Sequence, residues 1–239
     1  METSESLRTG RLSVVLPAYN EEESVPLAAD VIGNLLTRAG IDHELIFVND
    51  GSRDHTWRAI QEAAARRPQV RGIRFSRNFG KEAAIFAGLA QARGDCCVVL
   101  DCDLQHPPEK ILEMYSLWQQ GWQVVEGIKV SRGKESPLHT LAAKTFYRFL
   151  SGATRLDMSH ASDFKLLDRR AVDVLVAMRE KNAFFRALSS WIGFDTTQVE
   201  FEVQPRAAGQ SKWSLRSLTR YAVTNLAAFS TAPLQIVTI

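Results

Sequence analysis

The run Cys96-Cys97-Val98-Val99-Leu100-Asp101-Cys102-Asp103 joins five apolar residues to an abrupt polar end. Apolar runs of this length are typical of strands buried on both faces of a parallel sheet. On an extended backbone, residues two apart project to the same side, so the carboxylates of Asp101 and Asp103 can face one point. We therefore predict a buried strand over 96–100 that presents two carboxylates at its carboxyl end.

Similar apolar runs occur before and after this one, and segments with helical periodicity separate them. The predicted strands cover 12–16, which Pro17 ends, and 44–48, 70–75 and 124–127. The predicted helices cover 21–38, 80–92, 107–120 and a segment that Asp54 caps and that runs to about Arg67. This alternation predicts an α/β fold with a mostly parallel sheet and helices on both faces. Ligands of such sheets bind at the carboxyl ends of the strands.

The second half of the chain is less regular. We predict helices over 137–151, 169–180 and 182–192, and an edge strand over 197–203. No repeat, low-complexity tract or linker interrupts the sequence. We therefore expect one catalytic domain over 1–211, followed by a C-terminal segment over 212–239.

Composition narrows the classes of partner. The chain has 239 residues and a formal net charge of +2, which is too small to favour nucleic acid as a partner. Its three cysteines, an odd number in and beside an apolar run, argue against a disulfide framework. The spacing of Cys97, Cys102 and His106 does not match a paired zinc motif. Residues 1–11 lack an apolar signal region, so we predict a cytoplasmic location.

Two carboxylates side by side repel each other unless a cation lies between them. Mg²⁺ and Mn²⁺ prefer oxygen ligands and share them with substrate phosphates, and Gln105 could add a carbonyl oxygen. The simpler interpretation of Asp101 and Asp103, a solvated polar strand end, stays open on spacing alone. Asp50 is equally open, because it could contact a nucleotide or stabilise its own Gly-Ser turn.

Two common nucleotide-binding motifs are absent. The first predicted strand runs into Pro-Ala-Tyr-Asn rather than the glycine-rich turn of dinucleotide-binding proteins. Gly80-Lys81 resembles the end of a phosphate-binding P-loop, but Phe75 stands where the earlier glycine is required.

Five motifs follow one another at the predicted strand ends and near the C-terminus. They are Leu-Pro-Ala-Tyr-Asn-Glu-Glu (16–22), Val-Asn-Asp-Gly-Ser (48–52), Arg-Asn-Phe-Gly-Lys-Glu (77–82), Asp-Cys-Asp-Leu-Gln (101–105) and Arg-Ala-Ala-Gly-Gln-Ser-Lys-Trp (206–213). In this order they resemble the family 2 inverting glycosyltransferases, and within them the polyprenyl-phosphate branch of dolichyl-phosphate mannose synthases and bactoprenol glucosyltransferases. The resemblance extends from about residue 11 to 235.

The resemblance implies a GT-A fold, a divalent Mg²⁺ or Mn²⁺ ion, and transfer of a hexose from a nucleotide sugar to a polyprenyl phosphate with inversion. It implies a nucleotide-sugar site at Pro17, Tyr19, Glu21, Asp50, Lys81 and Asp101. It implies metal ligands at Asp101, Asp103 and Gln105, and an acceptor-phosphate site at Lys129, Arg132, Arg206, Ser211 and Lys212. Asp163, Asp103 and Arg132 would act in catalysis.

A phosphate acceptor carries about −1.5 to −2 charges at pH 7 and needs little help from a base. It needs screening from the anionic donor and alignment with the anomeric carbon. We therefore expect Asp163 to position the sugar or the acceptor rather than to act as an obligatory base. Two departures from the family pattern are His106, where aspartate is common, and Lys129, where arginine is usual and would offer a bidentate fork.

The C-terminal segment carries Arg216 and Arg220 on one predicted helix face and no charged residue after Arg220. A basic amphipathic helix is typical of a membrane interface. The resemblance implies transmembrane helices beyond this point, so we expect a truncated chain at the cytoplasmic face of the cell's inner membrane. Homo-oligomerisation stays open.

Several alternatives remain for the activity. UDP-glucose is the preferred donor, with GDP-mannose and UDP-N-acetylhexosamine as alternatives. A transferase that acts on a sugar hydroxyl would use Asp163 as a true base. A catalytically silent nucleotide-binding membrane scaffold is the non-enzymatic alternative.

Overall fold

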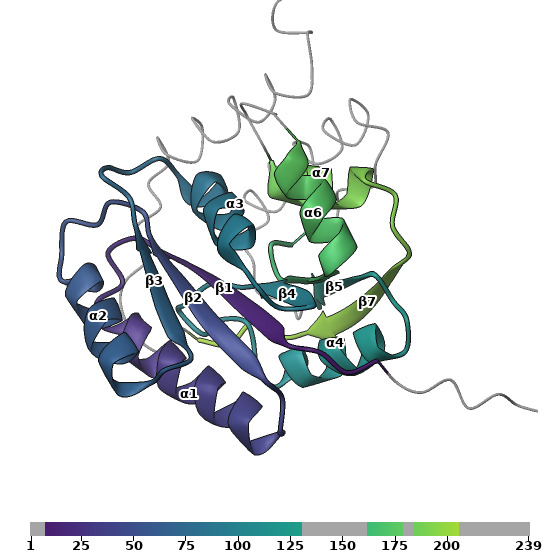
Figure 1. Cartoon of the computed structure of the whole chain (residues 1–239), viewed down its shortest axis with the longest axis horizontal. Helices are drawn as coiled ribbons and strands as arrows, with labels where there is room; N and C mark the ends of the chain where they lie inside the picture. The colour runs from purple at the N-terminus through teal and green to yellow at the C-terminus, as the bar shows by residue number, and fades with distance from the viewer. Residues whose placement is uncertain (1–7, 131–161, 179–183, 206–239) are drawn as a thin grey trace, which may run out of the picture.

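The computed structural model describes residues 8–130, 162–178 and 184–205, and these form a seven-stranded sheet in the order β3-β2-β1-β4-β6-β5-β7 (Figure 1). The strands are β1 (Leu12–Ala18), β2 (His43–Asn49), β3 (Val70–Arg74), β4 (Cys96–Val99), β5 (Val124–Lys129), β6 (Lys165–Asp168) and β7 (Thr196–Phe201). β1 pairs in parallel with β2 and β4, and β2 with β3. The predicted parallel α/β arrangement is therefore confirmed for the first half of the chain.

The second half adds a reversal that the sequence did not predict. β6 runs antiparallel to both β4 and β5, while β5 and β7 pair in parallel. β7 lies at the end of the sheet, as predicted for an edge strand. The sheet is therefore mixed, and β6 brings the segment that precedes it, including Asp163, to the carboxyl end of β4.

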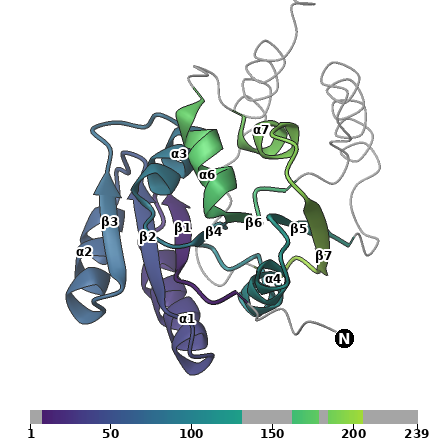
Figure 2. The ribbon, with the colours of Figure 1, turned by 45° about the vertical axis from the view of Figure 1, so that its right-hand side comes forward.

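Helices cover both faces of the sheet (Figures 1 and 2). One layer contains α1 (Ser24–Arg38), α2 (Thr56–Arg66) and α4 (Lys110–Gln119), and the other contains α3 (Lys81–Gln91), α6 (Arg169–Ala177) and α7 (Phe185–Trp191). Alternate residues of one strand serve the two layers, because side chains on a strand point to opposite faces. In β2, Leu45 and Phe47 pack with the α1 layer, whereas Ile46 and Val48 pack with the α3 layer.

We predicted that Pro17 ends the first strand. Instead, Pro17 lies inside β1 and pairs with Val48 of β2. Proline removes a backbone donor and is tolerated where a strand lacks a second neighbour. β4 pairs with β1 only as far as Val15, so Pro17 occupies a stretch of β1 that has β2 alone beside it.

Two predicted helices begin three residues late. α1 begins at Ser24, because Glu21 forms a turn in which its carbonyl oxygen accepts from the Ser24 and Val25 amides. Its glutamates therefore precede the first turn. α4 begins at Lys110, after a proline pair whose carbonyl oxygens accept from the Lys110 and Ile111 amides.

The predicted helix over 137–151 and the C-terminal segment over 212–239, with its domain boundary, lie outside the described residues. Among the described helices, none combines the length and the apolar character that a bilayer crossing requires.

Candidate active site

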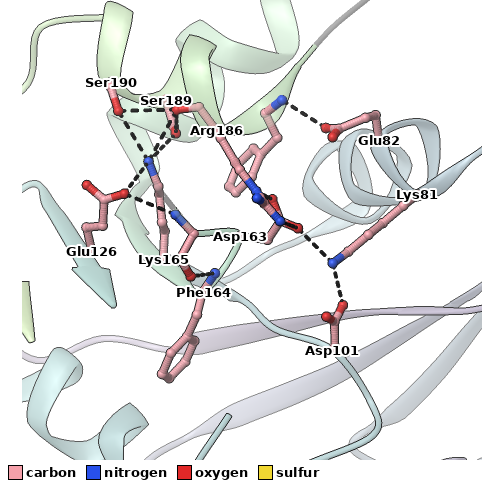
Figure 3. A network of polar contacts seen from close by, with 12 residues as sticks. Lys81, Glu82, Asp101, Glu126, Asp163, Phe164, Lys165, Arg186, Ser189 and Ser190 are labelled. Carbon is pink, nitrogen blue, oxygen red and sulfur yellow. Dashed lines mark hydrogen bonds and ion pairs between the residues drawn. The ribbon is translucent and has the colours of Figure 1, made fainter. Parts of the chain in front are cut away.

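A chain of charged side chains lies at the carboxyl end of β4 (Figure 3). The Lys81 ammonium lies 2.7 Å from Asp101 Oδ1 and 2.7 Å from Asp163 Oδ2. Asp101 follows β4, Lys81 begins α3, and Asp163 lies just before β6. The structure thus joins Lys81 and Asp101, both predicted for the nucleotide-sugar site, to Asp163, which was predicted for catalysis.

Asp50, at the end of β2, positions the start of α3. Its carboxylate accepts hydrogen bonds from the Phe79 amide at 2.7 Å and the Gly80 amide at 3.0 Å. Burial raises the pKa of Asp50, although these two hydrogen bonds act in the opposite direction. The side chain therefore holds the loop that delivers Lys81, and its predicted contact to a nucleotide stays a prediction.

Gly51 allows this loop to pack against the end of β2. It has a φ of +61°, and a Cβ atom there would lie 2.2 Å from the Arg77 carbonyl carbon. Both the backbone conformation and the close contact require glycine. Asp50 and Gly51 together set how far Lys81 reaches over the edge of the sheet.

The Asp163 carboxylate forms ion pairs with two cationic side chains. Arg186 of α7 donates from Nε to Oδ1 at 2.7 Å and from a terminal nitrogen to Oδ2 at 2.9 Å, and Lys81 donates to Oδ2. The Asp163 side chain is only 2% exposed. Burial alone would raise its pKa, but the charges of Arg186 and Lys81 hold the pKa of Asp163 well below its usual range. This carboxylate is therefore charged and fully engaged at neutral pH.

Glu82 connects the same turn of α3 to α7. Its Oε2 accepts from the Phe185 amide at 2.8 Å. Burial and the neighbouring Asp163 charge raise the pKa of Glu82 to about 7. Lys81 and Glu82 thus fix the first turn of α3 against Asp163 and against the beginning of α7.

A second buried network lies beside Asp163 and involves its chain neighbours Ser162 and Lys165 (Figure 3). The Lys165 ammonium lies 3.1 Å from Glu126 Oε1 and donates to Ser189 Oγ at 2.9 Å. Glu126 also accepts from the Ser162 amide at 3.4 Å. Burial lowers the pKa of Lys165, against the opposing effect of Glu126. This network ties β5 and β6 to α7, the helix that carries Arg186.

We expect Glu126→Gln to lower the free energy of unfolding by roughly 3 kcal/mol, because it leaves the buried Lys165 ammonium without its counter-ion. Urea unfolding at pH 7 measures this effect. The matched control is Glu62→Gln, since Glu62 pairs with Arg58 where the two side chains are 57% and 75% exposed. Exposed pairs contribute under about 1 kcal/mol. Equal losses in the two variants would contradict the structural role of the buried network.

We predicted that the two aspartates of the metal site lie on an extended strand, and this prediction is wrong. β4 ends at Val99, and residues 102–104 form a turn in which Leu104 has a φ of +59°. Asp103 is buried and accepts from the Gln105 amide at 3.1 Å. The Asp101 side chain is 34% exposed. The turn rather than strand alternation therefore sets the directions of the two carboxylates.

The donor chemistry of this turn fits a divalent cation that is shared with a diphosphate. Among the described residues, no three His, Cys, Asp or Glu side chains gather closely enough to hold a metal ion alone. Mg²⁺ is commonly held by one or two carboxylates together with substrate phosphates. His106 follows the turn, and its buried Nδ1 has no hydrogen-bond partner among the described residues. Burial lowers the pKa of His106, whereas the Asp101 and Asp103 charges act in the opposite direction.

The residues predicted for the nucleotide pocket lie along the neighbouring strand ends. Pro17 is buried in β1, whereas Tyr19 is 36% exposed just beyond it. Glu21 accepts a hydrogen bond from Ser24 Oγ at 2.6 Å. These positions lie at or near the carboxyl edge of the sheet, and their contacts to a nucleotide stay predictions.

Of the residues predicted for the acceptor phosphate, Lys129 alone lies within the described ranges. It ends β5, pairs with Phe201 of β7 and has an exposed side chain. Arg132, Arg206, Ser211 and Lys212 lie outside the described residues.

Sequence reasoning missed Arg186, Glu82, Lys165 and Glu126. Arg186 falls in a predicted helix, where an arginine is usually solvated, and no spacing connects it to Asp163. Cys96, Cys97 and Cys102 are free and buried in the structure. Burial raises the pKa of Cys97 to about 12, so this thiol is a poor nucleophile at neutral pH.

Residues 13–175 match the family described as glycosyl transferase family 2, which is more than half of the chain. The chain belongs to this family. A Bacillus subtilis family relative, the glycosyltransferase YkcC, is 39% identical over 225 residues, or 94% of this chain and 70% of the relative. The bactoprenol glucosyl transferase of Shigella phage SfV is 34% identical over 227 residues, or 95% of this chain and 74% of the relative. The family predicted from the five motifs is confirmed.

Solved glycosyltransferase structures share the fold. Mannosyl-3-phosphoglycerate synthase from Rubrobacter xylanophilus superposes with a TM-score of 0.67 at 17% identity, covering 96% of this chain and 76% of that one. Glucosyl-3-phosphoglycerate synthase from Mycobacterium tuberculosis, in complex with Mn²⁺, UDP and glucosyl-3-phosphoglycerate, gives 0.62 at 23% identity, covering 93% and 80%. The predicted GT-A fold is confirmed.

Proposed function

We propose that this family 2 glycosyltransferase moves a hexose, with glucose from UDP-glucose preferred, onto a polyprenyl phosphate with inversion. One observation carries the choice of a phosphate acceptor: Asp163 is fully paired with Arg186 and Lys81 and has a strongly lowered pKa. A sugar hydroxyl would need a base, whereas a phosphate oxygen is already anionic. The likeness to bactoprenol glucosyl transferases supports the same acceptor.

In this proposal Asp101 and Asp103, assisted by Gln105, hold Mg²⁺ or Mn²⁺ and the donor diphosphate. The ion would stabilise the negative charge that develops on the departing nucleoside diphosphate. Pro17, Tyr19, Glu21 and Asp50 form the nucleotide side of the pocket. The M. tuberculosis structure with Mn²⁺ and UDP supports a divalent cation for this fold.

Lys129, Arg132, Arg206, Ser211 and Lys212 would receive the acceptor phosphate. Their charges would screen the two anionic substrates from each other, and a fixed alignment would supply much of the rate enhancement. In this proposal Asp163 acts by holding Lys81 and Arg186 in place. The lipid acceptor places the reaction at a membrane surface, which we propose to be its cytoplasmic face.

The test supplies the full chain with a short-chain polyprenyl phosphate and, in turn, UDP-glucose, UDP-N-acetylglucosamine and GDP-mannose, with Mn²⁺ or with EDTA. We expect a glycosylated lipid from UDP-glucose that EDTA abolishes. The matched control is the same polyprenol without its phosphate, which should yield nothing. Product from the unphosphorylated alcohol, or transfer to a soluble glycan alone, would contradict the phosphate acceptor. Absence of product with every donor, and of donor-dependent thermal stabilisation, would favour the silent scaffold.

A further inference from the structure

Lys81 occupies a position between a carboxylate that solvent can reach and one that it cannot. The Asp101 side chain is 34% exposed, whereas the Asp163 side chain is 2% exposed. The Lys81 side chain itself is 27% exposed, and its ammonium lies 2.7 Å from an oxygen of each (Figure 3). One of the two carboxylate oxygens of Asp101, a predicted ligand of the divalent cation, is therefore already occupied by a cation of the protein.

The two carboxylates that pair with Lys81 differ in whether another cation of the protein also binds them. Asp163 is also held by Arg186 through two hydrogen bonds, so it stays compensated in any case. Asp101 is held by Lys81 near the surface. If Asp101 were taken by another cation, Lys81 would still contact Asp163 and would not become a bare buried charge, which is the costly outcome.

From this asymmetry we propose that Lys81 is an exchangeable counter-ion of Asp101, competing with the divalent cation until a diphosphate arrives. The proposal rests on the metal site of the proposed function. Without a diphosphate, a divalent cation at Asp101 lies beside the Lys81 ammonium, and the like charges repel. With a diphosphate present, its negative charges attract both cations, and the competition weakens.

The exchange also changes the charge of the cluster. Lys81 and Arg186 balance Asp101 and Asp163 when only these four side chains are counted. Once Asp101 ligates the divalent cation, Lys81 and Arg186 face Asp163 alone, with one positive charge in excess. The negative charges of the donor diphosphate can pair with this excess, so the exchange couples binding of the divalent cation to binding of the diphosphate.

The test measures Mn²⁺ affinity by titration with detection of free Mn²⁺ by electron paramagnetic resonance, on the full chain with and without UDP. We expect Lys81→Met to bind Mn²⁺ about tenfold more tightly than the wild type without UDP. With UDP the gain should shrink to about threefold or less, because the lost lysine also removes a partner of the diphosphate. Lys81→Arg keeps the charge and should behave as the wild type without UDP.

The matched control is Lys110→Met. Lys110 begins α4 as Lys81 begins α3, and it pairs with Glu113 on the surface. This variant should leave Mn²⁺ affinity unchanged in both conditions. Circular dichroism confirms that each variant is folded, and Lys81→Gln replaces Lys81→Met if the latter is not.

Two results separate this inference from the proposed function. Unchanged affinity of Lys81→Met without UDP, or an equal gain with and without UDP, overturns the role of Lys81 while the metal site stands. If Asp103→Ala leaves Mn²⁺ binding in the presence of UDP unchanged, the metal site itself is wrong, and the inference falls with it.

Discussion

Asp103→Ala is expected to lower the transfer rate by about a thousandfold or more, because the variant removes a carboxylate from the proposed metal site. Asp103 is buried and accepts a hydrogen bond from the Gln105 amide, so its carboxylate is held in a fixed place in the turn. The measurement is the initial rate of glucolipid formation at saturating UDP-glucose and Mn²⁺. A parallel Mn²⁺ titration with UDP should show the same variant binding the ion much more weakly.

A suitable control is Asp95→Ala, at the opposite end of β4. Asp95 is exposed and accepts a hydrogen bond from the Arg11 amide, far along the strand from the turn at 102–104. Its activity should stay within about twofold of the wild type, as expected for a surface change away from the site. A comparable rate in Asp103→Ala and the wild type would remove Asp103 from the reaction.

Asp163→Asn is expected to act mainly on stability and positioning. The substitution leaves Arg186 and Lys81 facing a neutral amide in a buried place, which should cost roughly 3 kcal/mol of unfolding free energy. Transfer should fall by about ten- to a hundredfold but stay measurable, because the phosphate acceptor does not require a base. Complete loss of transfer in a variant that is still folded would instead make Asp163 the base.

The pH dependence of stability tests the same ion pairs. A carboxylate whose folded pKa lies below its unfolded value of about 3.9 contributes stability above that value and loses it as the pH falls toward the folded pKa. The pKa of Asp163 is lowered in this sense. The difference in unfolding free energy between the wild type and Asp163→Asn should therefore be present at pH 8, above the pKa of about 7 of the neighbouring Glu82, and should shrink below about pH 4. A difference that vanishes near neutral pH would contradict the lowered pKa.

The parallel half of the fold could be predicted because its strands are continuous apolar runs, such as Cys96–Val99, that alternate with helical segments. β6 escaped prediction because it is four residues long and begins with Lys165, a residue type that is rarely buried. Its burial depends on Glu126, 39 positions earlier, and on the serines of α7. Local periodicity does not contain such long-range compensation.

The site could be predicted as a set of residues but not as an arrangement. The motifs indicated Lys81 and Asp101 for the donor site, Asp101 also for the metal, and Asp163 for catalysis. Their contact depends on the loop that Asp50 holds and on the docking of α7 through Glu82 and Arg186. The motif Asp101-Cys102-Asp103 likewise indicated the right residues, although the turn that follows β4 replaced the extended backbone that was expected.

The contacts of the charge cluster join residues that are far apart in the sequence, and this separation affects the order of folding during synthesis. Lys81 and Asp163 are 82 positions apart, and Glu82 and Phe185 are 103 apart. Contacts that close such long loops form late in folding, whereas β1, β2 and their helices can assemble earlier. During synthesis the ribosome therefore releases the parallel half of the sheet before the residues that complete the charge cluster. We therefore expect activity to appear only after α7 has docked, and not as soon as the parallel strands have formed.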